Sequence, residues 1–385
     1  MKRQHLGILV VLVLAIIASP VLAGDCILLK SGKYHQPGPQ NGNRPPNRND
    51  FDTSIYVVQS ENYDKLIYSM KIKGGKAAKQ TMDISKVDTV HYWPKPTAYT
   101  AAANLMNSGD YAGAIARFLA VAKDRSQRSW ARTYALMNIA LMYEDDGNLD
   151  GAIQAWEKLA KDFSRSRYVP KAFIQVGLAQ LSKGDAEAAK RSFERLGRLS
   201  GLPEGQKIMA KYYMILIKEK QGAAAKNQSL LRQALSEYKA LLGKTEGDTE
   251  LAEVAILCRL GIGTCQLLLG QYDQALAFFQ KIADAAKDPA VLAGAFIGLG
   301  DCYFKKNQWK DALLAFLRVE ILYDRNPEMT AQALYKSGKC FQFMLGDGIG
   351  EDNKIRAKTQ YGKCASKFPG SSWGRLSKEA IPTVR

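Results

Sequence analysis

Residues that could carry out acid–base or nucleophilic chemistry are scarce in this 385-residue sequence. Beyond the N-terminal apolar segment the only histidines are His35 and His91. A serine hydrolase needs a histidine beside a serine that is presented on a strand-to-helix elbow, and we identify no such elbow. The "KGGK" at residues 73–76 is typical of a hairpin turn rather than a phosphate-binding loop. We therefore expect no catalytic residue and no cofactor.

Metal ligands are also poorly grouped. Glu144, Asp145 and Asp146 form the densest acidic cluster, but a calcium site needs about six oxygens converging from several directions. A solvated helix end explains the cluster better, and we expect no metal site. The "NQS" at Asn227 matches a glycosylation acceptor, a triplet that is common by chance.

Six cysteines follow the N-terminal segment, and their spacing fits neither a compact disulfide framework nor a zinc site. Cys265, Cys302 and Cys340 recur at equivalent helical positions, where neighbouring helices are about 8–10 Å apart. A disulfide needs α-carbons within about 7 Å, so a ladder of bridges is excluded. We interpret the cysteines as small buried side chains, with Cys340–Cys364 as the best candidate for an exception.

The formal net charge is +17, with basic residues scattered among acidic ones. No basic block is interleaved with aromatic residues, so we do not expect nucleic acid as a partner. A lysine-rich solvated surface is the simpler interpretation, and attraction to acidic polymers or lipid headgroups is the other.

Residues 1–23 have the pattern of a secretory signal peptide. Lys2 and Arg3 precede an apolar run over residues 6–18, and Val21 and Ala23 are the small residues before a cleavage site. The run is short for a membrane-spanning helix. Asp25 before Cys26 disfavours, without excluding, a lipid-anchored form. We expect export to the periplasm or cell envelope, and no transmembrane segment in the mature chain.

A helical pattern then recurs seven times with a spacing of 37 to 45 residues. Each copy has an alanine, an aromatic residue four positions later, and an apolar residue or cysteine three positions after that. Offsets of four and seven place all three on one helix face. The alanine and aromatic pairs are Ala114 and Phe118, Ala152 and Trp156, Ala189 and Phe193, Ala234 and Tyr238, Ala275 and Phe279, Ala312 and Phe316, and Ala357 and Tyr361.

A first helix precedes each of these second helices. It carries a small residue seven positions before the turn, such as Ala140, Gly177 or Gly263, and we expect the marker alanine to face it. The turn has a glycine or asparagine for the left-handed conformation, as at Gly270, and an aromatic two positions later, as at Tyr272. Paired helices of this kind bury their apolar stripes by stacking.

The stretches "LGQYDQALAFFQKI" and "KNQWKDALLAFLRV" resemble the second-helix signature of tetratricopeptide repeats. The resemblance covers residues 96–370 and implies a mainly α fold, a right-handed α-solenoid of about seven helical hairpins. The fourth unit departs from the pattern through the insert "QGAAAKNQSLL", which is expected to lengthen the link between its helices. The end, from Tyr361 onward, resembles the close of envelope repeat proteins, which include outer-membrane assembly lipoproteins and the Tol-Pal-associated repeat protein.

Residues 24–95 are predicted to form a separate module, a small β-barrel or curled β-sheet of about four strands. A loop at about residues 36–50, rich in proline and asparagine, interrupts it. Residues 371–385 are expected to be a C-terminal tail.

In the repeat family the first helices line a concave groove that holds a peptide or protein. Carrying these groove positions over by resemblance gives a candidate partner-binding set, in which aromatic residues lie beside lysines. The same rings could instead pack against neighbouring helices. The set is Tyr134, Met137, Lys171, Asp301, Phe304, Lys305, Gln332, Tyr335, Lys339, Gln342 and Phe343.

Three classes of function follow. The leading hypothesis is a non-enzymatic interaction scaffold of the bacterial cell envelope, with a protein or peptide ligand in the groove. The second is binding of an anionic envelope polymer or surface, such as cell wall or lipopolysaccharide, through the basic surface. A hydrolase is the third, and the scarcity of histidine argues against it.

Overall fold

The computed structural model describes residues 24–31, 34–35, 56–71, 77–93, 95–323, 326–344 and 350–384. The predicted signal peptide and the proline-rich loop at 36–50 lie outside these residues. The chain divides into two compact units. One comprises residues 1–61 and 65–96, and the other comprises residues 62–64 and 97–385.

The first unit contains the predicted β module, built as two antiparallel sheets of three strands each. One sheet has the order β2-β1-β6 and the other β3-β4-β5. The described residues form six strands rather than the predicted four, and a short 3-10 turn at Ile84–Lys86 separates the last two. The strands are β1 (Gly24–Leu29), β2 (Tyr34–His35), β3 (Tyr56–Glu61), β4 (Lys65–Lys71), β5 (Ala77–Asp83) and β6 (Val87–Trp93).

A buried aspartate links the two sheets. Asp25 on β1 accepts a hydrogen bond from the backbone N–H of Val58 on β3 at 2.7 Å. Cys26 and Ile27 beside it, and Leu66 on β4, are fully buried. The module therefore has a small apolar core of its own, in which one carboxylate replaces a missing backbone partner.

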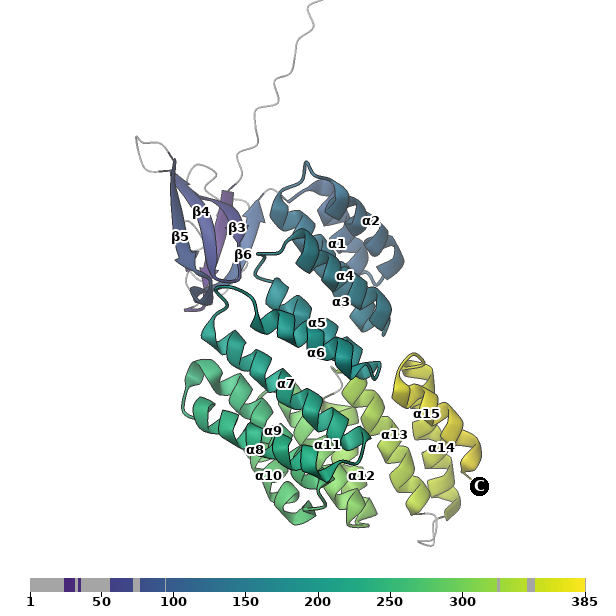
Figure 1. The fold of residues 1–385 in the computed structure, drawn as a ribbon. Coiled ribbons are helices and arrows are strands. Elements are labelled where there is room, and N and C mark those ends of the chain that lie inside the picture. Colours follow the sequence, from purple (N-terminus) through teal and green to yellow (C-terminus); the bar gives the residue numbers. More distant parts are fainter. Residues whose placement is uncertain are drawn as a thin grey trace, which may run out of the picture. The chain divides into compact units, whose positions relative to one another are not determined.

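Among the described residues, the second unit is an α-solenoid in which consecutive helices form seven antiparallel hairpins, and Figure 1 shows them stacked in chain order. The pairs are α1 (Thr97–Asn107) with α2 (Tyr111–Lys123), α3 (Ser129–Asp145) with α4 (Leu149–Asp162), α5 (Val169–Ser182) with α6 (Ala186–Gly197), α7 (Glu204–Ala224) with α8 (Gln228–Thr245), α9 (Ala252–Leu268) with α10 (Tyr272–Ala285), α11 (Pro289–Lys305) with α12 (Trp309–Leu322), and α13 (Pro327–Phe343) with α14 (Gly350–Lys367). A further helix, α15 (Ser372–Ala380), packs against α13 and α14.

The predicted repeat positions form the core of this array. All seven marker alanines and all seven rings are at most 1% exposed. The small first-helix residues were expected to face the marker alanines. Where they are glycines, the nearest atoms to an added β-carbon are those of the rings. A β-carbon at Gly263 would lie 2.8 Å from the Phe279 ring, and one at Gly300 would lie 2.5 Å from the Phe316 ring. Glycine is needed at these positions because the ring occupies the space of its missing side chain.

Some rings also contact the next hairpin. A β-carbon at Gly261 on α9 would lie 2.5 Å from the Tyr238 ring of the preceding hairpin, and Gly298 on α11 stands in the same relation to Phe279. Each of these rings is therefore held between two first helices, its own and the following one. This geometry joins neighbouring hairpins into one continuous core.

The turns adopt the left-handed conformation that the sequence indicates. Gly270 has φ of +79° and Asn307 has φ of +61°. In the fourth hairpin the equivalent residue is Lys226, with φ of +50°. The insert there does not lengthen the link, because α7 continues to Ala224 and α8 begins at Gln228. Its alanine and leucine residues favour helix, so the insertion lengthens the helices instead.

The residues predicted to form a C-terminal tail are mostly helical. Ser371 caps α15 by accepting a hydrogen bond from the N–H of Gly374 at 2.9 Å. Ala380 and Ile381 then pack against the core of the last hairpins. The end of the chain therefore covers part of the final hairpin.

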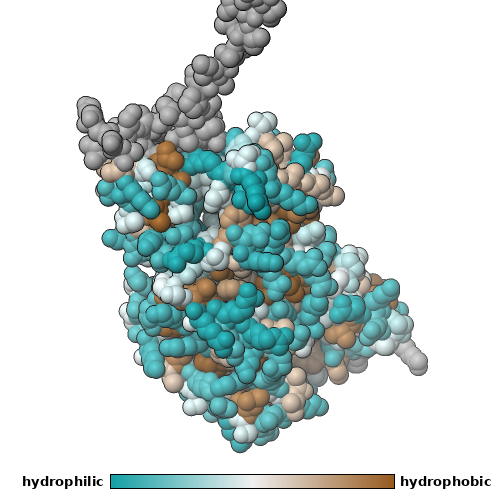
Figure 2. All heavy atoms as spheres, turned by 45° about the horizontal axis from the view of Figure 1, so that its top comes forward, coloured by the Kyte–Doolittle hydropathy of each residue, from teal (hydrophilic) through white to brown (hydrophobic). Residues whose placement is uncertain are grey.

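One helical segment among the described residues, Thr249–Leu268, is long and apolar enough to cross a membrane. It includes α9, which packs against α7, α8, α10 and α11. Cys258, Ile262 and Cys265 on this helix are at most 1% exposed. The apolar composition of α9 is explained by its packing against these four helices. On the face in Figure 2, hydrophilic side chains cover most of the described surface.

Candidate functional site

Three aromatic rings from successive helices meet at one end of the sixth and seventh hairpins. Trp309, the first residue of α12, stacks on Phe343 at the end of α13, with ring centroids 4.7 Å apart. Phe304, near the end of α11, contacts both rings edge-on, at 4.8 Å and 5.4 Å. Phe343 is 52% exposed, so this group presents an apolar ring face to solvent.

Two lysines flank these rings. The Nζ of Lys339 lies 5.9 Å from the Phe304 ring centroid and 5.8 Å from that of Tyr335. Lys305 is exposed in the last turn of α11. Among the described residues, neither lysine has a carboxylate within ion-pair distance. We call Phe304, Lys305, Trp309, Tyr335, Lys339 and Phe343 the aromatic–lysine cluster.

The candidate residue Asp301 is used within the array. Both of its carboxylate oxygens accept from Lys336 Nζ, at 2.6 Å and 2.7 Å, and this pair joins α11 to α13. Lys336 Nζ also lies 5.6 Å from the Trp373 ring and 5.7 Å from the Phe316 ring. Asp301 therefore positions α13, and its negative charge is already neutralised.

Two other candidates are partly covered by the end of the chain. Tyr335 lies between Tyr361 and Trp373, with ring centroids 5.7 Å and 5.5 Å away. Burial raises the pKa of the Tyr335 phenol, and Glu379 raises it further. Gln342 accepts from the Tyr361 hydroxyl at 3.0 Å and donates to Thr383 at 3.4 Å. Gln332 is half-buried on the same helix.

The candidates in the second and third hairpins belong to a different group of rings. Tyr134 contacts Trp130 and Tyr168 edge-on, at 6.0 Å and 5.2 Å, and Met137 is half-buried on the same helix. Lys171 lies over the buried Trp156, with Nζ 5.8 Å from the ring centroid. The candidate set therefore splits into two groups, and the C-terminal one has the clearer ring and cation geometry.

Trp309, Lys336 and Trp373 also belong to this region, although they were not among the predicted binding residues. Trp309 had a signal, since it occupies the aromatic position two residues after the turn. Lys336 follows Tyr335 directly, and its pairing with Asp301 depends on two hairpins lying side by side. Trp373 arrives only through α15, which the sequence analysis treated as tail.

The acidic cluster at residues 144–146 is not simply a solvated helix end. Glu144 accepts a hydrogen bond from the buried Trp156 indole N–H at 2.7 Å, and burial raises the pKa of its carboxyl. Asp145 accepts from the Tyr111 hydroxyl at 3.2 Å. Over the described residues, no group of three or more histidine, cysteine, aspartate or glutamate side chains could hold a metal ion.

The five cysteines on the helices are buried free thiols, as the helical positions indicate. Burial raises the pKa of Cys258, Cys302 and Cys340 to about 12. Cys364, the candidate partner of Cys340, donates instead to the Ala331 carbonyl at 3.3 Å. Burial thus disfavours the thiolate form of Cys258, Cys302 and Cys340.

One serine motif needs a correction. The letters "GSSWG" at residues 370–374 do fit the spacing Gly-x-Ser-x-Gly, although the sequence analysis identified no nucleophile elbow. The segment joins α14 to α15, so no strand precedes it, and the motif serine, Ser372, is the first residue of α15. The structural context of a hydrolase elbow is missing there.

Comparison with known proteins agrees with this architecture. Residues 99–167 and residues 258–288 each match a tetratricopeptide repeat family. These two segments are similar to tetratricopeptide repeats, and the buried rings recur at the same position in all seven hairpins. A search of curated proteins finds no match.

Several solved structures are similar at low identity. A tetratricopeptide repeat protein from Parabacteroides merdae is 17% identical, with 75% of this chain and 99% of that chain covered and a TM-score of 0.49. The C-terminal part of a repeat-containing protein from Cytophaga hutchinsonii is 14% identical, covering 72% and 98%, with a TM-score of 0.34. PilW, a type IV pilus biogenesis factor, is 17% identical, covering 63% and 97%, with a TM-score of 0.34.

Proposed function

We propose that this protein is a non-enzymatic scaffold of the bacterial cell envelope that holds a protein or peptide partner at the aromatic–lysine cluster. The repeat architecture supports a protein–protein interaction role in general. The observation that carries the specific site is the exposed Phe343 ring stacked on Trp309 beside Lys339. Exposed rings in a preformed group bury apolar area at little conformational cost, which is typical of binding hot spots.

The cluster also indicates the character of the partner. Lys305 and Lys339 are without carboxylate partners among the described residues, so an acidic segment would neutralise them. An apolar side chain placed on Phe343 would complete the ring group. We therefore expect a partner segment that combines an apolar anchor with nearby Asp or Glu.

Crosslinking in native cells, followed by identification of the captured proteins, is the most direct way to find that partner. The test variant is Phe343→Ala, because Phe343 is exposed and its removal leaves the packing of Tyr335 intact. Leu314→Ala on α12 is the matched control, since Leu314 is 60% exposed and lies outside the cluster. We expect Phe343→Ala to reduce capture of a specific protein at least fivefold and Leu314→Ala to leave it unchanged. Equal capture by both variants would refute the cluster as the site.

The location in the envelope rests on the pattern of residues 1–23. We expect fractionation to recover the protein outside the cytoplasm, with a mature N-terminus at Gly24. Mass spectrometry of the purified native protein measures this terminus directly. A full-length chain in the cytoplasmic fraction would contradict the proposal.

The net charge of +17 supports binding of an anionic envelope polymer as a second candidate function. Binding of this kind weakens strongly between low and high salt, because it depends on exposed charges. Measurements on lipopolysaccharide and cell-wall fragments at two ionic strengths separate the two proposals. Salt-insensitive binding to one protein supports the scaffold, and salt-sensitive binding to polymers supports the second function.

A further inference from the structure

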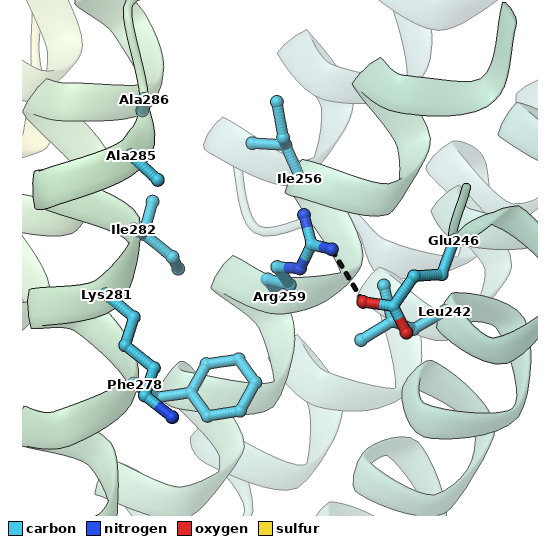
Figure 3. Close-up of a pocket in the computed structure, with 9 residues that line it drawn as sticks. All are labelled: Leu242, Glu246, Ile256, Arg259, Phe278, Lys281, Ile282, Ala285 and Ala286. Carbon is cyan, nitrogen blue, oxygen red and sulfur yellow. Dashed lines mark hydrogen bonds and ion pairs between the residues drawn. The ribbon is translucent and has the colours of Figure 1, made fainter. Parts of the chain in front are cut away.

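The fourth and fifth hairpins enclose a pocket of ≈ 480 Å³. Its walls are mostly apolar, with Leu242 from α8, Ile256 from α9, and Phe278, Ile282 and Ala285 from α10. Figure 3 shows the α10 side chains on one side of the space and Glu246 and Leu242 on the other, with Arg259 between them. The volume suits one large side chain.

The next hairpin shows what occupies the equivalent space. Tyr323, the residue that caps α12, stacks on Phe296 of α11 with ring centroids 5.7 Å apart and an interplanar angle of 13°. Repeat alignment places Tyr323 at the position of Ala286 and Phe296 at the position of Arg259. The second hairpin has Phe163 at the same capping position. In the fifth hairpin the chain thus supplies two alanines, Ala285 and Ala286, where a neighbouring hairpin supplies a ring.

The charges at the rim are asymmetric. Arg259 donates to Glu246 at 2.8 Å, which leaves that pair neutral. Lys281 is exposed and has no ion-pair partner among the described residues. In the sixth hairpin the equivalent cation, Arg318, lies over the Phe296 ring at 5.1 Å. Repeat alignment thus places Lys281 where the sixth hairpin has the cation that covers Phe296, the ring stacked on Tyr323.

We propose that this pocket binds an aromatic side chain of a partner peptide, with an acidic residue next to that aromatic residue. The ring takes the place that Tyr323 fills in the sixth hairpin, and the carboxylate pairs with Lys281 at the rim. This second docking site lies in the fourth and fifth hairpins and is separate from the aromatic–lysine cluster. A partner that reaches both sites would gain avidity without new contacts.

The test uses the full mature chain and a fluorescein-labelled pentapeptide, Gly-Asp-Tyr-Asp-Gly, in anisotropy titrations. Filling the pocket with Ala286→Tyr or Ala285→Phe should weaken binding at least tenfold, because the protein's own ring occupies the space. Ala277→Tyr is the matched control, since it places the same side chain on an exposed position of α10 outside the pocket. Circular dichroism and thermal unfolding confirm that each variant is folded.

Two further measurements address the chemistry of the ligand. A pentapeptide with alanine in place of tyrosine should bind at least tenfold more weakly, and one with asparagine in place of aspartate about threefold more weakly, because only the rim charge is lost. Lys281→Gln should remove the difference between the aspartate and asparagine peptides.

Failure of this proposal is distinct from failure of the proposed function. If the wild-type chain shows no saturable binding up to millimolar peptide, or if Ala286→Tyr, Ala285→Phe and Ala277→Tyr all bind as wild type does, the pocket proposal is overturned. If Phe343→Ala abolishes peptide binding while Ala286→Tyr does not, the peptide binds at the aromatic–lysine cluster, which also overturns the pocket. Retained binding in Phe343→Ala together with loss in Ala286→Tyr supports the pocket.

Discussion

Hairpins whose buried ring is a phenylalanine differ from those whose ring carries a hydrogen-bond donor. In the second, fourth and seventh hairpins the donor reaches a side chain near the end of the first helix. Trp156 donates to Glu144 at 2.7 Å, Tyr238 to Glu219 at 3.1 Å, and Tyr361 to Gln342 at 3.0 Å. In the four phenylalanine hairpins the equivalent first-helix residues are Met106, Leu181, Leu267 and Phe304.

This difference shows that the buried ring of the second helix and the residue that faces it on the first helix are matched in polarity. A buried donor without an acceptor costs free energy, and a buried acceptor without a donor does as well. The acceptor therefore occurs where the ring has a polar atom, and an apolar side chain occurs where it has none. The match is visible in the sequence once the hairpin register is known.

The largest expected effect tests what both kinds of ring share, their volume. Phe279→Ala should lower the free energy of unfolding by about 3–5 kcal/mol, because the ring fills the space between Gly263 and Gly298. Urea or thermal unfolding followed by circular dichroism measures the loss. The control is Phe278→Ala, which removes a half-buried ring next to it and should cost clearly less. Equal losses from the two changes would show that the marker position has no special role.

The second prediction removes the hydrogen bond between the ring and its acceptor. Tyr238→Phe removes the tyrosine donor of the buried Glu219, which then keeps only Lys220 at 3.5 Å, and should cost about 1–3 kcal/mol. Adding Glu219→Leu to this variant recreates the phenylalanine type of hairpin, so most of the loss should be recovered. Unfolding of both single variants and the double variant gives the coupling free energy. Additive effects would mean that the two positions are not matched.

The third prediction concerns pH and the acceptor. Burial raises the pKa of Glu219 above its ordinary value of 4.5, so the folded state holds this proton more tightly than the unfolded state. Its contribution to stability therefore falls as pH rises from 4.5 through the raised pKa, and is constant above it. Glu219→Gln should remove this dependence, with an effect smaller than that of Tyr238→Phe.

The comparison is made between wild type and Glu219→Gln, by thermal midpoints at closely spaced pH values. Taking the difference between the two proteins cancels the titration of the other carboxylates. A difference that stays constant with pH would contradict the raised pKa. In the hairpins whose ring is phenylalanine the equivalent first-helix residue is apolar, so this position contributes no pH dependence there.

The smallest effect concerns a contact that is independent of ring type. Lys183 pairs with Asp150 of the second hairpin, whose ring is tryptophan, and Lys306 pairs with Asp273 of the fifth, whose ring is phenylalanine. These pairs are solvent-exposed, so Lys306→Ala should change stability by less than about 1 kcal/mol. The change should shrink further in high salt. A loss as large as that of Tyr238→Phe would place these ion pairs among the main stabilising contacts between hairpins.

Much of the repeat architecture could be predicted, because its pattern is local. The offsets of four and seven identify a buried face on each second helix, and the rings of that face are indeed buried. Except at Lys226 in the fourth hairpin, the described turns followed from glycine and asparagine, whose backbone freedom is a property of the residue alone. The insert of the fourth hairpin was wrongly predicted to lengthen the link between the helices. The prediction failed because an insertion that lengthens a loop and one that lengthens two helices differ little in sequence.

The candidate site was predictable only in part. Phe304, Tyr335, Lys339 and Phe343 were selected from groove positions, and the structure brings them together. Their binding role stays a prediction. Asp301 was selected by the same rule but pairs with Lys336, because two first helices lie close enough for their side chains to meet.

The sequence by itself determined the number of hairpins, their buried rings and most of their turns. These depend on residues within about twenty positions of each other, which one hairpin brings together. Only the tertiary structure decided what happens between hairpins. It placed α15 over Tyr335, set the rings of Tyr238 and Phe279 against glycines of the next hairpin, and left a pocket where Ala285 and Ala286 are too small to fill it. Such contacts depend on how neighbouring surfaces complement each other, and no local spacing encodes that fit.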